Sequence, residues 1–198
     1  MQISSSRHAA NRSAASAMYG DQFYNMQLAA RDNGWTPFSA MENHYNMLYR
    51  EDERELIPIC KQTGVSLMPY SPLAAGHLTR PTWEADTLRA RNDRVARGKY
   101  DRMEQEDIKI VERVHQLAEK PGCKMSQTAL AWQWAKGVAF PIVGATKAKY
   151  LDDAAGALEV QLTPEDIALL EECYVPHPIV GAINANPPQA VMLLDVKK

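Results

Sequence analysis

Helical and strand-like segments alternate along the first half of this 198-residue chain, and the alternation limits the folds that it can adopt. Residues 22–31 carry apolar side chains at helical spacing, and residues 38–45 form a short, partly alternating segment. Residues 52–63 again suit a helix, which Pro58 should kink, and residues 65–70 suit a strand. Because strands that are separated by helices commonly pair in parallel, this order predicts an α/β fold built from β/α units.

The second half of the chain predicts more helices and one further strand. Residues 73–101 are mostly polar, and loops of this length usually act as lids or lack order. A helix is expected over residues 104–120, with a single apolar stripe on one face. That stripe consists of Ile108, Val111, His115 and Ala118, with Val114 and Leu117 beside it. The other predicted elements are a helix capped by Ser126, a buried strand over residues 140–143, a helix ending near Leu158, and a last helix with Thr163 as its N-cap.

Composition and charge exclude several classes of protein. The 22 basic and 24 acidic side chains give a net charge of −2, which offers no electrostatic reason to expect nucleic acid or an anionic membrane as a partner. No run approaches the roughly 18 apolar residues that suggest a transmembrane helix. The three cysteines, Cys60, Cys123 and Cys173, are too few and too far apart for a disulfide framework, so a reducing, cytoplasmic setting is expected.

The first twenty residues differ in composition from the remainder. They contain Arg7, Arg12 and many Ser and Ala residues, with no acidic residue before Asp21. This composition is compatible with an organelle transit peptide, although a disordered or divergent start is the interpretation that we favour.

Three candidate binding loops follow predicted strands. They are Met41–Tyr45, Pro69–Gly76 and Gly144–Lys147. In parallel α/β folds the loops at the carboxyl ends of the strands bind ligands. The third loop joins small residues to a helix N-terminus and a cation, which suits a phosphate, although an ordinary strand-to-helix connection has the same pattern.

The order of several motifs resembles the later part of an aldo-keto reductase. These motifs are MYGDQF, ENHYNMLYREDERELIPICKQTGV, MPYSPLAAGHLTRP, PIVGATKAKYLDDA and LTPEDIALLEE, and the resemblance runs from about Ala15 to about Pro178. It implies an α/β fold of the (β/α)₈ TIM barrel type, of which this chain would form the later β/α units only. It also implies an enzyme that binds NADP(H) and reduces an aldehyde or ketone by hydride transfer.

The resemblance also implies which residues contact the cofactor. Tyr70 would stack on the nicotinamide ring, while Ser71 and Leu73 would line the pyrophosphate region, with Gly76 in the loop that follows. The remaining implied cofactor-binding residues are Ser16 and Glu42 at the carboxamide, Gly144 in the third loop, Thr146 and Lys147 at the adenosine 2′-phosphate, and Asp153 near the adenine.

Three positions in or next to this set of residues depart from the family pattern. Glu42 stands where the family commonly has Gln, and an ionised Glu cannot donate a hydrogen bond to the carboxamide. Ala17 is small where a polar residue is frequent, and Tyr150 replaces the usual Arg or Gln. The cofactor site is therefore expected to lack some of the contacts that are usual in the family.

No residue of this chain is predicted to be catalytic. The family's catalytic Asp, Tyr, Lys and His lie on earlier strands, before the region of resemblance, and a complete barrel typically needs about 250 residues. The ANRSA segment stands where the family has an apolar strand, so we expect that strand to be lost. Two alternatives stay open, namely a catalytically silent NADP(H)-binding or regulatory subunit and a nonfunctional truncated product.

The expected organisation is a divergent, disordered start over residues 1–14, a partial barrel over 15–178 and an irregular tail over 179–198. A partial barrel has open edges, so self-association or a partner chain is expected. The histidines are not spaced like zinc ligands, and His77 is expected at the surface.

Overall fold

The structure is a computed structural model that describes residues 13–84, 92–119 and 122–181. Three short strands form a parallel sheet in the order β1-β2-β3, namely β1 (Ala14–Ser16), β2 (Ala40–Glu42) and β3 (Ser66–Leu67). Met41 at the centre is fully buried and lies opposite both Ala15 and Leu67. The parallel β/α organisation predicted from the alternation is thus confirmed.

A short strand, β1, forms at the end of the ANRSA segment, so the expectation that this strand is lost is corrected from Ala14 onward, whereas residues 10–12 lie outside the described part. Backbone pairing continues beyond its ends, because Ser39 N–H donates to Ser13 O at 2.9 Å and Ala17 N–H donates to Glu42 O at 3.3 Å. Parallel pairing uses backbone groups, and the small side chain of Ala15 is sufficient to fill the buried face. The apolar run that is missing from the sequence is therefore not needed for this strand to form.

The segment after α6 runs beside β3 on the side away from β2. Ala139 N–H donates to Leu67 O at 3.2 Å, and Ile142 N–H donates to Pro69 O at 2.8 Å. The predicted buried strand over residues 140–143 is nonetheless wrong in two respects. Only a parallel bridge between Ile142 and Tyr70 forms, since Pro141 lacks an N–H, and 62% of the Phe140 side chain is exposed.

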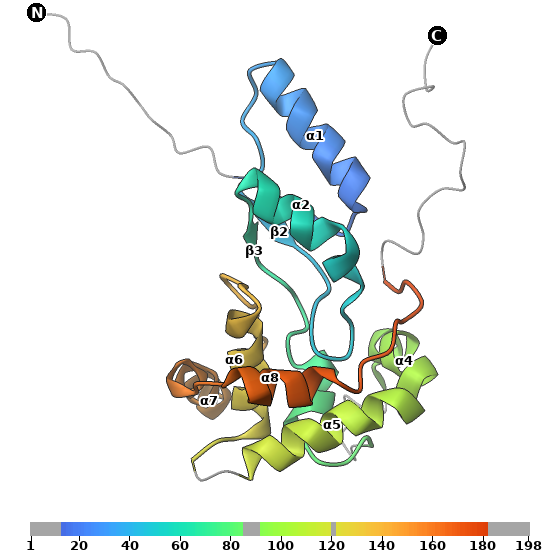
Figure 1. Ribbon diagram of the computed structural model, residues 1–198, viewed down its shortest axis with the longest axis vertical. Coiled ribbons are helices and arrows are strands. Elements are labelled where there is room, and N and C mark those ends of the chain that lie inside the picture. The colour runs from blue at the N-terminus through green and yellow to red at the C-terminus, as the bar shows by residue number, and fades with distance from the viewer. Residues whose placement is uncertain (1–12, 85–91, 120–121, 182–198) are drawn as a thin grey trace, which may run out of the picture.

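Helices α1 (Gly20–Asp32) and α2 (Leu56–Thr63) lie side by side next to the sheet (Figure 1). A 3₁₀ turn, η1 (Glu51–Arg54), precedes α2, and the helical path breaks at Glu55 instead of kinking at Pro58. Pro58 is the third residue of α2, where its missing N–H leaves no helical hydrogen bond unmade.

The other helices gather at the opposite end of the view in Figure 1. The polar stretch that was expected to be a loop contains helical elements, with η2 before residues 85–91 and α4 after them. Residues 85–91 themselves lie outside the described part of the chain. In chain order the elements are η2 (Ala74–Thr79), α4 (Arg94–Tyr100), η3 (Asp101–Met103), α5 (Glu104–Ala118), α6 (Met125–Ala135), α7 (Ala148–Gly156), η4 (Ala157–Glu159) and α8 (Pro164–Glu171).

The buried face of α5 lies to one side of the predicted stripe. Val111, Val114 and Leu117 are buried, as predicted, and so are Asp107 and Ile110, whereas His115 is only half-buried. A second correction concerns α6, whose N-cap is Lys124, so that Ser126 lies inside the first turn.

The core contains one further residue that was expected elsewhere. His77 is buried and its ring stacks on Trp83 with centroids 4.0 Å apart, so the expectation of a surface histidine is wrong. Its imidazole packs as an aromatic ring, and burial lowers its pKa to about 4. Trp132 and Cys60 are fully buried.

Within residues 13–84, 92–119 and 122–181, none of the helices has both the length and the hydropathy that crossing a bilayer requires. The same residues contain no cluster of three or more His, Cys, Asp or Glu side chains that could hold a metal. Expectations for residues 1–12 and 182–198 fall outside the described part.

Candidate cofactor site

The loops after the strands gather at the carboxyl edge of the sheet. Ser71 follows β3, Ala17 follows β1, and Gly144 follows the segment that pairs with β3. The strands and the bridged segment that precede these residues run in parallel, so the carboxyl ends of these segments meet at one edge of the sheet. The structure therefore places the predicted binding loops on one side of the sheet.

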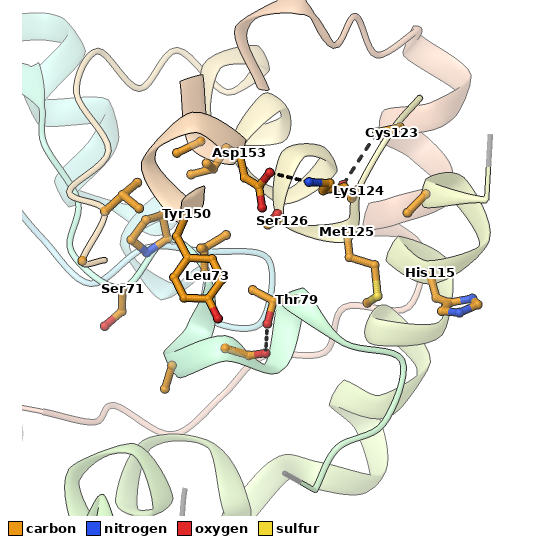
Figure 2. Close-up of a pocket in the computed structure, with 18 of the residues that line it drawn as sticks. Ser71, Leu73, Thr79, His115, Cys123, Lys124, Met125, Ser126, Tyr150 and Asp153 are labelled. Carbon is orange, nitrogen blue, oxygen red and sulfur yellow. Dashed lines mark hydrogen bonds and ion pairs between the residues drawn. The ribbon is translucent and has the colours of Figure 1, made fainter. Parts of the chain in front are cut away.

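A cavity of about 810 Å³ opens beside two of these loops (Figure 2). Residues of η2 and the turn before it form one wall, and α7 forms the facing wall with Tyr150 and Asp153. The carboxyl end of α5 and the start of α6 close the remaining side of the cavity. Five of the predicted cofactor-binding residues line this cavity, namely Ser71, Leu73, Gly76, Gly144 and Asp153.

The wall formed by residues 71–76 has an unusual backbone. Ser71, Ala74 and Ala75 all adopt a left-handed conformation, with φ between 48° and 55°. Non-glycine residues pay about 1–2 kcal/mol for this conformation, and such strain concentrates at ligand sites. Gly76 has φ of 99°, a conformation that other residues rarely adopt, so a side chain at this position would strain the backbone.

Asp153 is neutralised where it faces the cavity. Its carboxylate forms an ion pair with Lys124, which the dashed line in Figure 2 marks. A bare carboxylate would repel a nucleotide's phosphates, and the ammonium group of Lys124 offsets that repulsion. Sequence reasoning missed Lys124, because a lysine that follows Gly122 and Cys123 carries no motif by itself.

Thr146 and Lys147 do not line the cavity but lie next to it. Both are exposed, and Lys147 is the N-cap residue of α7 with no side-chain cap on the helix. The N–H groups in the first turn of a helix have no intrahelical acceptor, so the amino end of α7 can hold an anion. Gly144 and this turn thus provide an uncapped helix terminus and a cation at the mouth of the cavity.

Tyr70 lies at the start of the loop that contains residues 71–76. Its ring belongs to a column of three rings, Tyr49, His44 and Tyr70, which we call the aromatic stack. The His44 ring stacks on Tyr49 with centroids 4.4 Å apart, and on Tyr70 with centroids 5.2 Å apart and planes 6° from parallel. Tyr70, Asn43 and Ala17 line a second, much smaller cavity. The structure therefore places Tyr70 where a flat ring could be held, but not inside the larger cavity.

The members of the stack are uncharged near neutral pH. Burial, with smaller contributions from the charges of Lys99 and His177, lowers the pKa of His44 to about 3. Burial also raises the pKa of Tyr70, and it raises the pKa of Tyr49 to about 12. The edge of His44 is fixed by the Tyr100 hydroxyl, which lies 2.9 Å from Nε2.

Ser16 and Glu42 face each other across β1 and β2 but line neither cavity. They are register partners in the sheet, Ser16 is exposed and Glu42 is half-buried. Their neighbours Ala17 and Asn43 line the small cavity instead. Both residues end their strands, but their side chains do not form part of either cavity wall.

Comparison with known proteins shows the family of this chain. The profile described as the Aldo/keto reductase family matches residues 16–175. The chain belongs to the aldo/keto reductase family. The small parallel sheet with its helices is consistent with part of the (β/α)₈ barrel that this family implies.

Three relatives of this family member illustrate the similarity. It is 42% identical over 166 residues to versiconal hemiacetal acetate reductase of Aspergillus parasiticus, covering 83% of this chain and 48% of that protein. It is 42% identical over 168 residues to an aldo-keto reductase of Fusarium vanettenii, covering 84% and 45%. It is 43% identical over 169 residues to an aldo-keto reductase of Alternaria alternata, again covering 84% and 45%. The chain spans about half the length of the curated relatives that it matches.

Proposed function

We propose that this chain forms the NADP(H)-binding part of an aldo/keto reductase whose reaction is the reduction of an aldehyde or ketone. The observation that supports the proposal most strongly is the 810 Å³ cavity between η2 and α7, because five predicted cofactor-binding residues line it. Its volume falls in the range usual for small-molecule and cofactor sites. The bound nicotinamide would supply the hydride.

The chain's own residues fit the nucleotide end of this cofactor. The strained loop over residues 71–76 brings its backbone to the cavity, where it would support the pyrophosphate. The uncapped amino end of α7, together with Thr146 and Lys147, would hold the 2′-phosphate and so favour NADP(H) over NAD(H). Asp153 would approach the adenine while paired with Lys124.

The nicotinamide end would rest on Tyr70, with Ser16 and Glu42 at the carboxamide. Tyr70 offers an uncharged ring that is backed by His44. Neither Ser16 nor Glu42 lines either of the two cavities described above, so their contribution requires side-chain movement toward Ala17 and Asn43.

The test of this function is a titration of the full chain with NADPH and with NADH. We expect saturable binding of NADPH, and Lys147→Met should weaken it roughly tenfold because a charged phosphate contact is lost. The same substitution should leave NADH binding unchanged, and Lys109→Met on the exposed face of α5 should leave both unchanged. Absence of saturable binding would contradict the proposal.

A second assay distinguishes an active enzyme from a cofactor-binding subunit. NADPH oxidation is followed in the presence of a reactive aromatic aldehyde. Turnover supports reduction by this chain itself, whereas binding without turnover supports a subunit that needs residues from elsewhere. The second outcome is favoured by the pKa values of Tyr49 and Tyr70, which burial raises so that neither gives up a proton readily near neutral pH.

A further inference from the structure

The two cavities at the carboxyl edge of the sheet differ greatly in size. The cavity between η2 and α7 has a volume of about 810 Å³, whereas the cavity beside Tyr70 has a volume of about 10 Å³. The smaller space holds about one water molecule. A nicotinamide, which is a six-membered ring with a carboxamide group, does not fit into it. The described residues therefore fit the cofactor at its adenosine end and do not fit it at its nicotinamide end.

The ring of Tyr70 is already in contact with other groups. The His44 ring lies parallel to it with centroids 5.2 Å apart, and Lys99 Nζ lies 4.4 Å from its centroid, a distance typical of a cation–π contact. The backbone at Gly181 also lies against this pair, because a Cβ atom built there would be 3.6 Å from the Tyr70 hydroxyl and 3.7 Å from Lys99 Cε. A nicotinamide could stack on Tyr70 only if the Lys99 ammonium left the ring.

The adenosine end has an aromatic ring that borders the larger cavity. Figure 2 shows the Tyr150 side chain extending from α7 toward η2, and 41% of this residue is exposed. Such a ring offers a stacking surface for a purine base, with Leu73 on the facing wall. Lys149 Nζ lies 5.3 Å from the Tyr150 centroid, but Lys149 is exposed, so it can move away without opening the fold.

We propose that this chain recognises the adenosine 2′-phosphate half of its ligand and that the nicotinamide adds almost nothing to the affinity. The inference rests on the proposed function and broadens its ligand class to 2′-phosphorylated adenosine nucleotides, with or without a nicotinamide. Stacking on Tyr70 would add one contact and remove the cation–π contact of Lys99, and these two contacts are of similar strength. The site is thus an anchor for the nucleotide that leaves the hydride-carrying ring unheld.

The test compares two ligands that differ only in the nicotinamide. ADP-ribose 2′-phosphate is the cofactor without that ring, so calorimetry on the full chain with this compound and with NADPH measures what the ring contributes. We expect the two dissociation constants to agree within about twofold, because the gained and lost contacts offset each other. A ring that is held by stacking on an aromatic side chain would instead make NADPH bind roughly five- to a hundredfold more tightly.

A substitution on α7 tests the adenosine end. Tyr150→Ala removes the proposed stacking surface and places a good helix former in α7. We expect it to weaken ADP-ribose 2′-phosphate and NADPH by the same factor, roughly fivefold or more, because both ligands carry the base. Trp35→Ala removes an exposed aromatic ring that lines neither cavity, so this control should change neither dissociation constant.

A second measurement follows the nicotinamide ring itself. Reduced nicotinamide is fluorescent, and its emission moves to shorter wavelength when the ring leaves water. We expect NADPH that is bound to the unaltered chain to emit at the same wavelength as free NADPH.

Three results would overturn the inference and leave the proposed function intact. They are an NADPH affinity more than about fivefold above that of ADP-ribose 2′-phosphate, an emission shifted to shorter wavelength on binding, and unchanged binding of both ligands by Tyr150→Ala. If the unaltered chain binds neither ligand, the proposed function itself fails and this inference fails with it.

Discussion

Single hydrogen bonds at helix ends give the most local test of the structure. Thr163 Oγ1 accepts from Asp166 N–H at 3.2 Å, and the Asp166 carboxylate accepts from Thr163 N–H at 3.1 Å. Ser126 was the other predicted cap, but it lies within the first turn of α6. The two hydroxyl residues should therefore respond differently to the same substitution.

We expect Thr163→Ala to lower the free energy of unfolding by about 1 kcal/mol, because an N–H of α8 loses its cap. Ser126→Ala should change it by less than about 0.5 kcal/mol. Urea denaturation of both variants measures the difference. Equal losses at the two sites would show that Ser126 also caps a helix.

A buried ion pair links the segment after α8 to α5 and makes stability depend on pH. His177 Nε2 lies 3.0 Å from Asp107 Oδ1, and both side chains are almost fully buried. Burial lowers the pKa of His177, but its hydrogen bond to the Asp107 carboxylate and the charge of that group outweigh burial, so the pKa is raised. Folding therefore favours the protonated imidazole.

The raised pKa of His177 fixes the sign of its pH dependence. Its contribution to stability is fully present below the unfolded-state pKa of about 6.5 and is lost as the pH rises through the folded-state value. We expect the difference in unfolding free energy between the unaltered chain and the Asp107→Asn/His177→Gln double variant to fall over this range. Urea titrations at a series of pH values measure it, and a difference that grows with pH would contradict the assignment.

At the scale of elements, Glu51 joins η1 to the segment that follows α8. Its carboxylate accepts from the Tyr174 hydroxyl at 2.7 Å and from His177 N–H at 2.8 Å, and it pairs with Arg54. These contacts fix residues 174–177 against η1 across more than 120 positions of sequence.

We expect Glu51→Ala to lower the free energy of unfolding by about 2–3 kcal/mol, because a buried N–H and a hydroxyl lose a charged acceptor. Limited proteolysis should then cut near residues 174–177 earlier than the elements of the core. Glu112→Ala, at an exposed position of α5, is the matched control and should change neither result. An unaltered cleavage pattern in Glu51→Ala would show that Glu51 does not hold this segment.

Elements with strong local signals could be predicted from the sequence. Helices α1 and α8 were predicted because Asn33-Gly34 ends the first and Thr163-Pro164 begins the second. The break before α2, the position of the buried face of α5 and the burial of His77 were not, because each depends on contacts distant in sequence. His77, for example, packs against both Trp83 and Tyr100, and no local sequence pattern predicts these two ring contacts.

In the candidate site too, features with a local motif could be predicted and features that depend on distant contacts could not. Loops at strand ends could be placed from the motifs, and five of the implied residues line one cavity. Lys124 could not be found, because its importance comes from Asp153, which lies 29 residues away in the sequence. Tertiary proximity, with no motif of its own, gives this lysine its place in the site.

At the scale of the whole molecule, the described sheet has two open edges. Strand β1 pairs only with β2, and on the other side Phe140 and Ile142 expose 62% and 40% of their side chains. Unpaired edges and exposed apolar groups favour pairing with another chain. We therefore propose that the isolated chain self-associates through these edges.

Sedimentation velocity over a range of concentrations tests this proposal. We expect the sedimentation coefficient to rise with concentration, and Phe140→Ser/Ile142→Ser to reduce the rise by removing apolar contact area. Trp35→Ser, at an exposed position after α1, serves as the control. A monomer at every concentration, with a sharp cooperative thermal transition, would contradict the proposal.

The central claim is that the cavity between η2 and α7 holds the nucleotide end of NADP(H). Hydrogen–deuterium exchange of the full chain, with and without NADPH, tests it most directly because every segment is observed at once. We expect slower exchange over residues 71–79 and 144–154, with no change over residues 104–112 of α5, which do not line the cavity. Protection confined to other segments, or none at saturating NADPH, would contradict it.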